Sequence, residues 1–259
     1  MDDLIRLSIS NDRLQITKNH MLQLTGKEIH YLKKVMRVKV GQEIFILNGE
    51  GSLWRGIKNE GDYIKLINFD KPIIFNKRKN ILLGLAVVLP KSGFEEILKM
   101  STELGIDLIQ PLYSDRQIKR PSNNFIKEER WNLILNESVE QCERLWKPNL
   151  LHIAKITNWI ESVFEKDLLS ISVTRDEHVK WLRNWLDNQK IQSNKKVIIW
   201  NVIGPEGGWS KKELEFFYSY KIQLVKLSEN ILRTSTAALN ASSLLNNWRD
   251  EKMQFLNYK

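Results

Sequence analysis

Two polar loops near the C-terminus contain the residues best suited to chemistry. The first, residues 204–208, reads Gly-Pro-Glu-Gly-Gly and follows an apolar run. Glycines lack a Cβ, so main-chain amides and carbonyls can approach a ligand closely there. The second loop, residues 227–237, contains Arg233, the one charge within ILRTSTAAL, and an arginine in such a setting is usually paired or functional. We therefore predict that the two loops lie side by side and form a pocket.

The sequence also predicts the strands and helices that would position these loops. The apolar run 197–203 predicts a buried strand, and Ser210 with Glu213 predicts a capping box at the start of a helix. Residues 225–227 predict a second strand, and Ala237, Ala241, Leu244, Leu245 and Trp248 trace the buried stripe of a terminal helix. A purely structural alternative is that residues 204–208 form only a tight turn, for which glycine is equally suited.

Upstream, two regions differ in their pattern. Residues 1–70 predict short strands at 4–9, 43–47, 53–57 and 63–67, interrupted by a helix at 27–37, which is typical of a small β-barrel. Residues 69–80 contain a proline and several cations and predict a linker. From residue 81, apolar strands (81–89, 106–112, 150–156, 168–174) alternate with helices (from Phe94, 126–146, and around 179–186). This alternation predicts an α/β domain with a parallel sheet covered on both faces.

Composition excludes several classes of protein. No apolar run approaches the roughly 18 residues of a membrane helix, and the acidic N-terminus does not resemble a secretory signal. Cys142 is the single cysteine, which suits a reducing cytoplasm, and with four scattered histidines it gives no basis for a metal site. Neither a P-loop nor a dinucleotide fingerprint is present. We expect a cytoplasmic protein with no membrane segment and no metal.

Basic residues gather in two places. The chain has a net charge of +9, and residues 29–42 include Lys33, Lys34, Arg37 and Lys39 but no acidic residue. A second group, Arg116, Lys119 and Arg120, follows a predicted strand. Each group could be only a solvated face. Together they favour RNA as a partner, with the basic helix following the nucleic-acid backbone.

At the level of motifs, IGPEGGWS and LSENILRTSTAAL resemble the signature pair of the bacterial 16S ribosomal RNA uridine N3-methyltransferases. KMSTELGIDLIQPLYSDR, RWNLILNESVEQCERLWKP and HYLKKVMRVKVGQEIFILNGEG resemble further segments of that family, in the same order. The family belongs to the SPOUT superfamily. The resemblance implies a PUA-like RNA-binding barrel at residues 1–72 and a methyltransferase domain with a trefoil knot at residues 77–259.

The resemblance also implies partners and site residues. The cofactor would be S-adenosyl-L-methionine, and the substrate a uridine of 16S ribosomal RNA in the small ribosomal subunit. A homodimer is implied, with the C-terminal helix and Trp248 at its interface. The residues expected to bind the cofactor are Ile203, Gly204, Pro205, Glu206, Gly207, Gly208, Leu227, Ile231, Leu232, Arg233, Thr234 and Ala237. Those expected to bind RNA are Lys33, Lys34, Arg37, Arg116, Arg120, Gln141 and Arg144.

For methylation at uridine N3, the imide proton must leave. A cation could stabilise the negative charge on the uracil carbonyls, and Arg233 is the candidate. Glu206 and Asp176 are the candidate bases. This chain departs from the family by having Ser235 where an acidic residue is common, and residues 90–94 where a Gly-Asp-Arg-like turn is common.

Two alternatives stay open at this stage. One is a SPOUT methyltransferase acting on another RNA base or on transfer RNA. The other is a non-catalytic RNA-binding assembly protein that keeps the fold without the cofactor.

Overall fold

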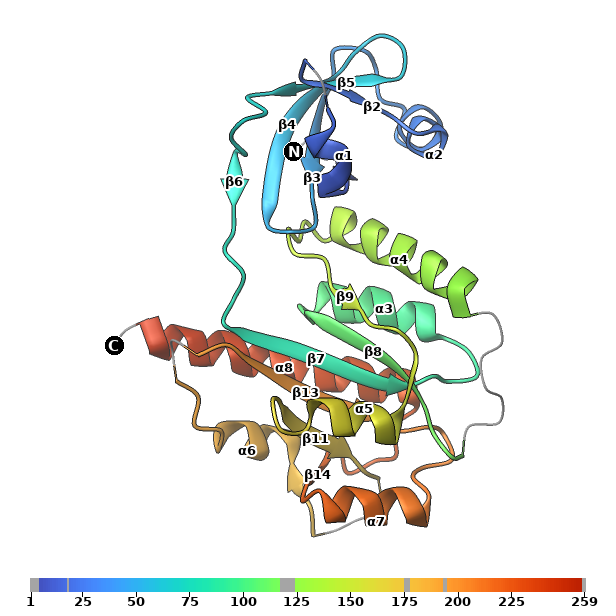
Figure 1. The fold of residues 1–259 in the computed structure, drawn as a ribbon, viewed down its shortest axis with the longest axis vertical. Coiled ribbons are helices and arrows are strands. Elements are labelled where there is room, and N and C mark those ends of the chain that lie inside the picture. Colours follow the sequence, from blue (N-terminus) through green and yellow to red (C-terminus); the bar gives the residue numbers. More distant parts are fainter. Residues whose placement is uncertain (1–4, 18, 117–123, 175–177, 193–194, 258–259) are drawn as a thin grey trace. The chain divides into compact units, whose positions relative to one another are not determined.

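The chain forms two compact units. The computed structural model describes residues 5–17, 19–116, 124–174, 178–192 and 195–257 (Figure 1). One unit comprises Met1–Arg78 and Asn136–Lys147, and the other comprises Lys79–Leu135 and Pro148–Lys259. The first unit therefore includes residues 136–147, which the sequence pattern placed in the second domain. The physical reason is a small apolar cluster in which Val139 and Leu145 pack with strand residues of the first unit.

The first unit is built on a six-stranded sheet in the order β1-β3-β4-β5-β2, with β6 paired to β4. The pairing of β1 with β3 is parallel, and the other pairings are antiparallel. Its elements are β1 (Arg6–Ser8), α1 (Asn11–Gln15), β2 (Met21–Gln23), α2 (Gly26–His30), the π-helical turn η1 (Tyr31–Val35), β3 (Glu43–Leu47), β4 (Ser52–Lys58), β5 (Tyr63–Ile67) and β6 (Ile74–Phe75).

Sequence patterns predicted most of this unit. The strands expected at 43–47 and 63–67 are confirmed with the same bounds as β3 and β5. The helix expected at 27–37 is shorter in its α-helical part, because α2 passes into η1 after His30; its start is confirmed by a capping box between Thr25 and Glu28. The pattern missed α1, β2 and β6. Because β6 lies within residues 69–80, the segment expected to be only a linker adds a strand to the sheet.

The second unit contains an eight-stranded sheet, in which every strand pairing is parallel, as predicted. The strand order is β10-β8-β7-β13-β11-β14-β12, with β9 paired to β8. Its elements are β7 (Ile81–Val88), α3 (Phe94–Glu103), β8 (Leu108–Tyr113), α4 (Asn124–Gln141), β9 (Asn149–Leu150), β10 (Ala154–Lys155), α5 (Ile156–Val163), β11 (Leu168–Ser172), β12 (Lys180–Trp181), α6 (Leu182–Asp187), β13 (Val197–Ile203), α7 (Lys211–Ser219), β14 (Gln223–Lys226) and α8 (Thr234–Asn257).

Both faces of this sheet are buried. Along β7, Leu83, Leu85 and Val87 belong to a core shared with α3, α6 and α8, whereas Ala86 and Val88 belong to a core shared with α5 and α7. Successive side chains of a strand point to opposite faces, so a strand buried on both faces is apolar at nearly every position. This explains the continuous apolar runs that predicted the α/β class.

Some predicted boundaries were wrong. The helix expected at 126–146 ends at Gln141, and Glu143 then adopts a left-handed φ of +61°, which turns the chain out of the helix. The strand expected at 150–156 is two short strands, β9 and β10, with α5 beginning at Ile156. Among the described residues, no helix combines the length and apolarity needed to cross a membrane.

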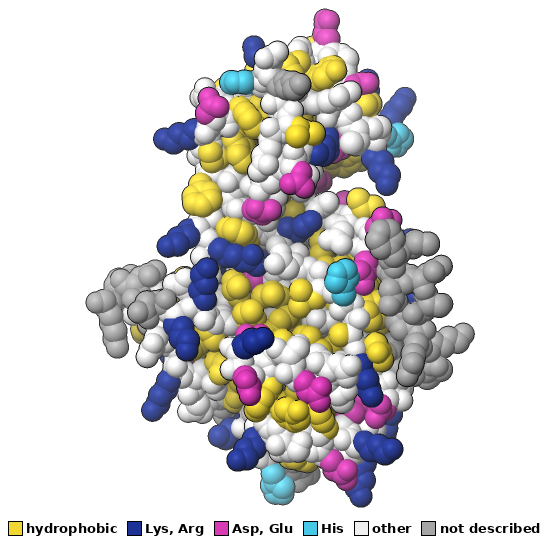
Figure 2. Space-filling model, viewed as in Figure 1, with side chains coloured by type: hydrophobic (Ala, Val, Ile, Leu, Met, Phe, Trp, Pro, Cys, Tyr) yellow, Lys and Arg dark blue, Asp and Glu magenta, His cyan; other side chains and the backbone are white. Residues whose placement is uncertain are grey.

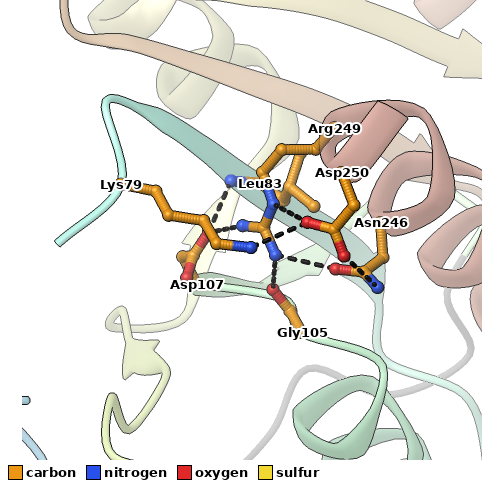
Figure 3. A network of polar contacts seen from close by, with 7 residues as sticks. All are labelled: Lys79, Leu83, Gly105, Asp107, Asn246, Arg249 and Asp250. Carbon is orange, nitrogen blue, oxygen red and sulfur yellow. Dashed lines mark hydrogen bonds and ion pairs between the residues drawn. The ribbon is translucent and has the colours of Figure 1, made fainter. Parts of the chain in front are cut away.

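A buried ion pair holds α8 against the sheet (Figure 3). Nη1 of Arg249 lies 2.6 Å from Oδ2 of Asp107, and the two side chains are 3% and 9% exposed. The same carboxylate oxygen accepts the amide of Leu83, while Nη2 of Arg249 donates to the carbonyl of Gly105 and to Asn246. The network ties the C-terminal helix to the loop before β8.

Candidate cofactor pocket

The glycine-rich loop lies between β13 and α7, as predicted. A turn within it is closed by the amide of Gly208 donating to the carbonyl of Pro205 at 2.9 Å, and Gly208 has a φ of +68°. The capping box is confirmed in both directions: Ser210 Oγ accepts the amide of Glu213, and the Glu213 carboxylate accepts the amide of Ser210. The carboxyl ends of parallel strands are where α/β sheets place ligands.

Two glycines of this loop have different surroundings. A Cβ at Gly204 would lie 2.9 Å from the ring of Trp209, so this glycine permits close packing of that indole. The indole N–H donates to the carbonyl of Ser172 at 2.9 Å, which ties the loop to the end of β11. A Cβ at Gly207 would meet nothing closer than the Arg116 side chain at 3.8 Å. Gly207 is therefore a position where the main chain is open to a ligand.

The second loop connects β14 to α8. Its conformation is held by the side chain of Asn240, which donates to the carbonyl of Leu227 at 3.4 Å, and by Ser228 Oγ, which accepts the amide of Asn230 at 3.1 Å. The first turn of α8 is closed by the amide of Ala237 donating to the carbonyl of Arg233. These hydrogen bonds give the loop a defined shape.

A single cavity of about 950 Å³ joins the two loops. All the residues that the sequence assigned to the cofactor line it: Ile203, Gly204, Pro205, Glu206, Gly207, Gly208, Leu227, Ile231, Leu232, Arg233, Thr234 and Ala237. The cavity falls in the size range of small-molecule sites. The structure thus brings together two segments that the sequence could only suggest were neighbours.

Sequence reasoning missed part of this lining. The missed residues lie at the end of β11 and after it, just before and within α7, in β14 and in the loop that follows β14, and they are Ser172, Val173, Thr174, His178, Trp209, Leu214, Tyr218, Leu224, Ser228 and Asn230. The parallel pairing of β11 with both β13 and β14 brings its end next to the two loops. Strand order is not encoded in any local motif, so periodicity could not have identified the residues at and after the end of β11, whereas Trp209, Ser228 and Asn230 lie within the two motifs already assigned to the pocket.

Arg233 lies at the end of the second loop. The sequence indicated that this arginine would be paired or functional; its side chain is exposed, and the nearby Ile231 is 63% exposed. The reason is that both residues precede α8, whose buried stripe begins with Thr234 and Ala237. Among the described residues, no ion-pair partner approaches Arg233, so its charge is available to a ligand in the cavity.

Of the two candidate bases, Glu206 lines the cavity and Asp176 lies outside the described residues. Glu206 is exposed, and its Oε1 accepts the amide of Lys91 at 3.2 Å. That bond connects the loop after β7 to the glycine-rich loop. The carboxylate is exposed at the cavity, which suits either a hydrogen-bond acceptor or a weak base.

The segment after β8 holds the glycine-rich loop from its other side. Arg116 Nη1 donates to the carbonyl of Gly207 at 2.8 Å. The amide of Asp115 donates to Glu213 at 3.0 Å, and Ser210 Oγ donates to the Asp115 carboxylate at 3.3 Å. Arg116, which the sequence assigned to RNA, therefore lines the cavity and contacts its main chain.

The other residues assigned to RNA lie mainly in the first unit. Lys33, Lys34 and Arg37 are exposed; Lys33 lies 3.3 Å from Asp62, and Arg37 has a left-handed φ of +53°. Gln141 is exposed at the end of α4, Arg144 is partly buried, and Arg120 lies outside the described residues. Among the described residues, no group of three His, Cys, Asp or Glu side chains could hold a metal ion.

Comparisons with known proteins agree along the chain. The family described as RNA methyltransferase domain matches residues 77–246, and the family described as RNA methyltransferase PUA domain matches residues 24–57. A relative from Synechocystis sp., named ribosomal RNA small subunit methyltransferase E, is 33% identical over 86% of this chain and 72% of its own length. A relative of the same name from Rickettsia conorii is 28% identical over 89% of this chain and 88% of its own.

Solved structures share the fold. A Legionella pneumophila methyltransferase in complex with the cofactor SAM has a TM-score of 0.80, with 22% identity over 94% of this chain and 97% of its own. A Neisseria gonorrhoeae ribosomal RNA small subunit methyltransferase E bound to S-adenosyl methionine has a TM-score of 0.74, with 22% identity over the same shares, 94% and 97%.

Proposed function

The chain belongs to the RNA methyltransferase family, and we propose that it transfers the methyl group of S-adenosylmethionine to N3 of a uridine in 16S ribosomal RNA. The observation that carries the proposal is the common cavity of the loops at 204–208 and 227–237. The curated relatives are named for methylation of small-subunit ribosomal RNA, and two solved neighbours are described with this cofactor bound. The choice of uridine N3 rests on the motif resemblance.

The cavity fits this cofactor by its chemistry. Its apolar wall includes Ile203, Leu227 and Ala237, which suits an adenine ring. Its glycine-rich side leaves the main chain of Gly207 open, so amides and carbonyls can form hydrogen bonds with polar groups of a ligand. When bound, S-adenosylmethionine supplies a methyl group on a sulfonium, which needs no covalent help from the protein.

The side chains of the site would then act on the acceptor base. Uridine N3 carries a proton at neutral pH, and removing that proton places negative charge on the two uracil carbonyls. We assign Arg233 to stabilising this charge, because its guanidinium is exposed at the cavity without an ion-pair partner among the described residues. Glu206 is the candidate proton acceptor among the described lining residues.

The finer architecture belongs to the same proposal. We assign the first unit to a PUA-like barrel covering residues 1–72, and residues 77–259 to a SPOUT domain with a trefoil knot around the cavity. Lys33, Lys34, Arg37, Arg120, Gln141 and Arg144 are proposed to contact RNA. We expect a homodimer in the cytoplasm, where ribosomes are assembled. Trp248 is only 2% exposed within its own chain, so it does not supply the dimer contact suggested by its sequence position.

Mass spectrometry of ribosomal RNA nucleosides from cells with and without the gene tests the proposal. We expect loss of one 3-methyluridine from small-subunit RNA in the deletion strain, restored by the wild-type gene. Loss of a different methylated nucleoside, or a loss confined to transfer RNA, would instead support another RNA methyltransferase activity. An unchanged nucleoside profile together with an absence of cofactor binding would support the non-catalytic assembly protein.

A further inference from the structure

An exposed apolar ridge lies on the first unit and shares no residue with the lining of the cofactor cavity. Ile73, Ile74 and Phe75 follow one another in the chain and are 47%, 46% and 66% exposed. Successive side chains of a strand point to opposite faces, so neither side of this segment is covered. A run of three exposed apolar residues is unfavourable for a soluble surface unless it has a function.

The ridge is held firmly in place. Strand β6 pairs with β4, with Phe75 opposite Ser52 and Ile74 opposite Leu53. The amide of Ile73 donates to Leu53, and that of Asn76 donates to Gly51, both over 2.8 Å. The indole of Trp146 donates to the carbonyl of Asn76 at 2.8 Å. The apolar side chains therefore project from a hydrogen-bonded main chain.

Cations flank the ridge. Lys71 and Lys77 are exposed, and among the described residues neither has an ion-pair partner. The guanidinium of Arg78 lies 5.1 Å from the centroid of the Trp146 ring. No acidic residue occurs in residues 71–94. Figure 2 shows hydrophobic side chains with Lys and Arg side chains beside them in the region where Figure 1 places β6.

We infer that this ridge and its flanking cations, together residues 71–78, bind an unpaired segment of the RNA substrate. Phe75 would stack on a base, and Lys71 and Lys77 would contact phosphates. Aromatic side chains beside cations are the general means by which proteins hold single-stranded nucleic acid. An RNA duplex keeps its bases stacked inside and would offer the ridge only its phosphates. The inference rests on the proposed function, since it specifies how the same substrate is held.

The test measures binding to two RNAs by fluorescence anisotropy: a short single-stranded RNA of mixed sequence and the same sequence in a hairpin stem. Phe75→Ala should weaken single-strand binding about 5- to 150-fold, the range for loss of one base–aromatic stack. Hairpin binding should stay close to that of the wild type, and Phe75→Tyr should bind the single strand normally. Replacing Lys71 and Lys77 by Gln should lower the slope of log affinity against log salt by about 1.4.

Phe255→Ala is the matched control, because Phe255 is also an exposed phenylalanine, 69% exposed, on α8. Its single-strand affinity should equal that of the wild type. Normal single-strand binding by Phe75→Ala, an equal loss for the hairpin, or an equal loss in the control would each overturn the inference. So would conversion of a dimer to a monomer by Phe75→Ala in light scattering, since the ridge would then be a protein interface.

The inference and the proposed function fail separately. If wild-type protein transfers no methyl group to RNA, the proposed function is wrong, whatever Phe75→Ala does to binding. If the wild type methylates RNA and Phe75→Ala binds single strands normally, only the ridge assignment is wrong. Cofactor affinity of Phe75→Ala, measured by calorimetry, should be unchanged, because Phe75 does not line the cavity.

Discussion

The guanidinium of Arg116 donates a hydrogen bond to the carbonyl of Gly207 over 2.8 Å, joining segments 91 residues apart. This bond fixes the glycine-rich loop from the side of β8, while Lys91 reaches the same loop from the side of β7 through Glu206. The segments that follow two neighbouring strands therefore shape the cavity, and their hydrogen bonds hold the glycine-rich loop that forms one of its walls.

Arg116→Ala should weaken S-adenosylmethionine binding about tenfold or more, because a hydrogen bond with a charged donor contributes about 1.5–3 kcal/mol. Arg116→Lys should recover part of the affinity, since an ammonium can reach a single carbonyl but not with the same fixed geometry. Isothermal titration calorimetry measures both. Lys211→Ala is the control, because that side chain is 91% exposed. Unchanged affinity in Arg116→Ala would show that the loop keeps its shape without this bond.

Substitutions at Gly207 and Gly204 should have opposite consequences. Gly207→Val adds atoms where the structure has room, so stability should hold while cofactor binding is lost. Gly204→Val places a Cβ 2.9 Å from the Trp209 ring, and such overpacking costs about 1–3 kcal/mol of unfolding free energy. Calorimetry and thermal melts separate the two effects. Cofactor binding that survives in Gly207→Val would refute the assignment of this loop to the cofactor.

Arg233→Ala should lower the single-turnover methylation rate constant by about 100-fold or more at saturating RNA and cofactor, by analogy with loss of one oxyanion donor. Arg233→Lys should recover only part of the rate. Because Arg233 is exposed without an ion-pair partner among the described residues, the melting temperature of Arg233→Ala should equal that of the wild type. A normal rate constant would end the catalytic assignment.

The stability of the first unit should fall as pH rises toward neutrality. Burial, the largest cause, together with the charges of Glu137 and Glu28, raises the pKa of the Glu140 carboxyl to about 7, against the opposing effect of the hydrogen bond from the Ser8 amide. A carboxyl with a raised folded-state pKa stabilises the fold below its unfolded pKa and loses that contribution as pH passes through the folded value. The loss can reach about 3 kcal/mol for a rise from 4.5 to about 7.

Glu140→Gln should remove this pH dependence and raise stability at pH 8, because an amide can still accept the Ser8 N–H without a charge. Urea unfolding between pH 4 and pH 8 measures the effect. Glu129→Gln, at an exposed position of the same helix, should leave the pH profile unchanged. A wild-type profile in Glu140→Gln would show that this carboxyl is ionised throughout the range.

Arg249→Met should destabilise the second unit by about 3–5 kcal/mol, because it leaves the Asp107 carboxylate buried without its partner. Adding Asp107→Asn should recover much of the loss, since no unpaired charge then remains inside. Lys79→Gln is the control: its ion pair with Asp250 is about half exposed and should cost no more than about 1 kcal/mol. Urea unfolding monitored by tryptophan fluorescence compares the variants. Equal losses of unfolding free energy in Arg249→Met and Lys79→Gln would contradict the prediction that a buried unpaired charge is more destabilising than an exposed one.

The sequence alone determined the local features of this protein. The capping box at Ser210 involves residues three positions apart, so its side chains identify a helix start without any tertiary information. The apolar runs of β7 and β13 indicate burial on both faces of the sheet, and this pattern too is carried by consecutive residues. The strand, loop and helix order around 204–208 follows from these signals, whereas the sequence could only suggest that the two loops are neighbours.

Tertiary structure decided what joins distant segments. The Arg116–Gly207 contact, the tie from Trp209 to Ser172 and the packing of residues 136–147 on the first unit all depend on which strands become neighbours. Strand order and crossovers arise from packing of the whole chain, and no short motif specifies them. The same cause sets the surroundings of Arg233: the sequence indicated that it would be paired or functional, and its place just before α8 leaves it exposed at the cavity. Features that depend on residues close along the chain can thus be recognised from the sequence, whereas only the tertiary structure determines which faces of the helices and strands are covered.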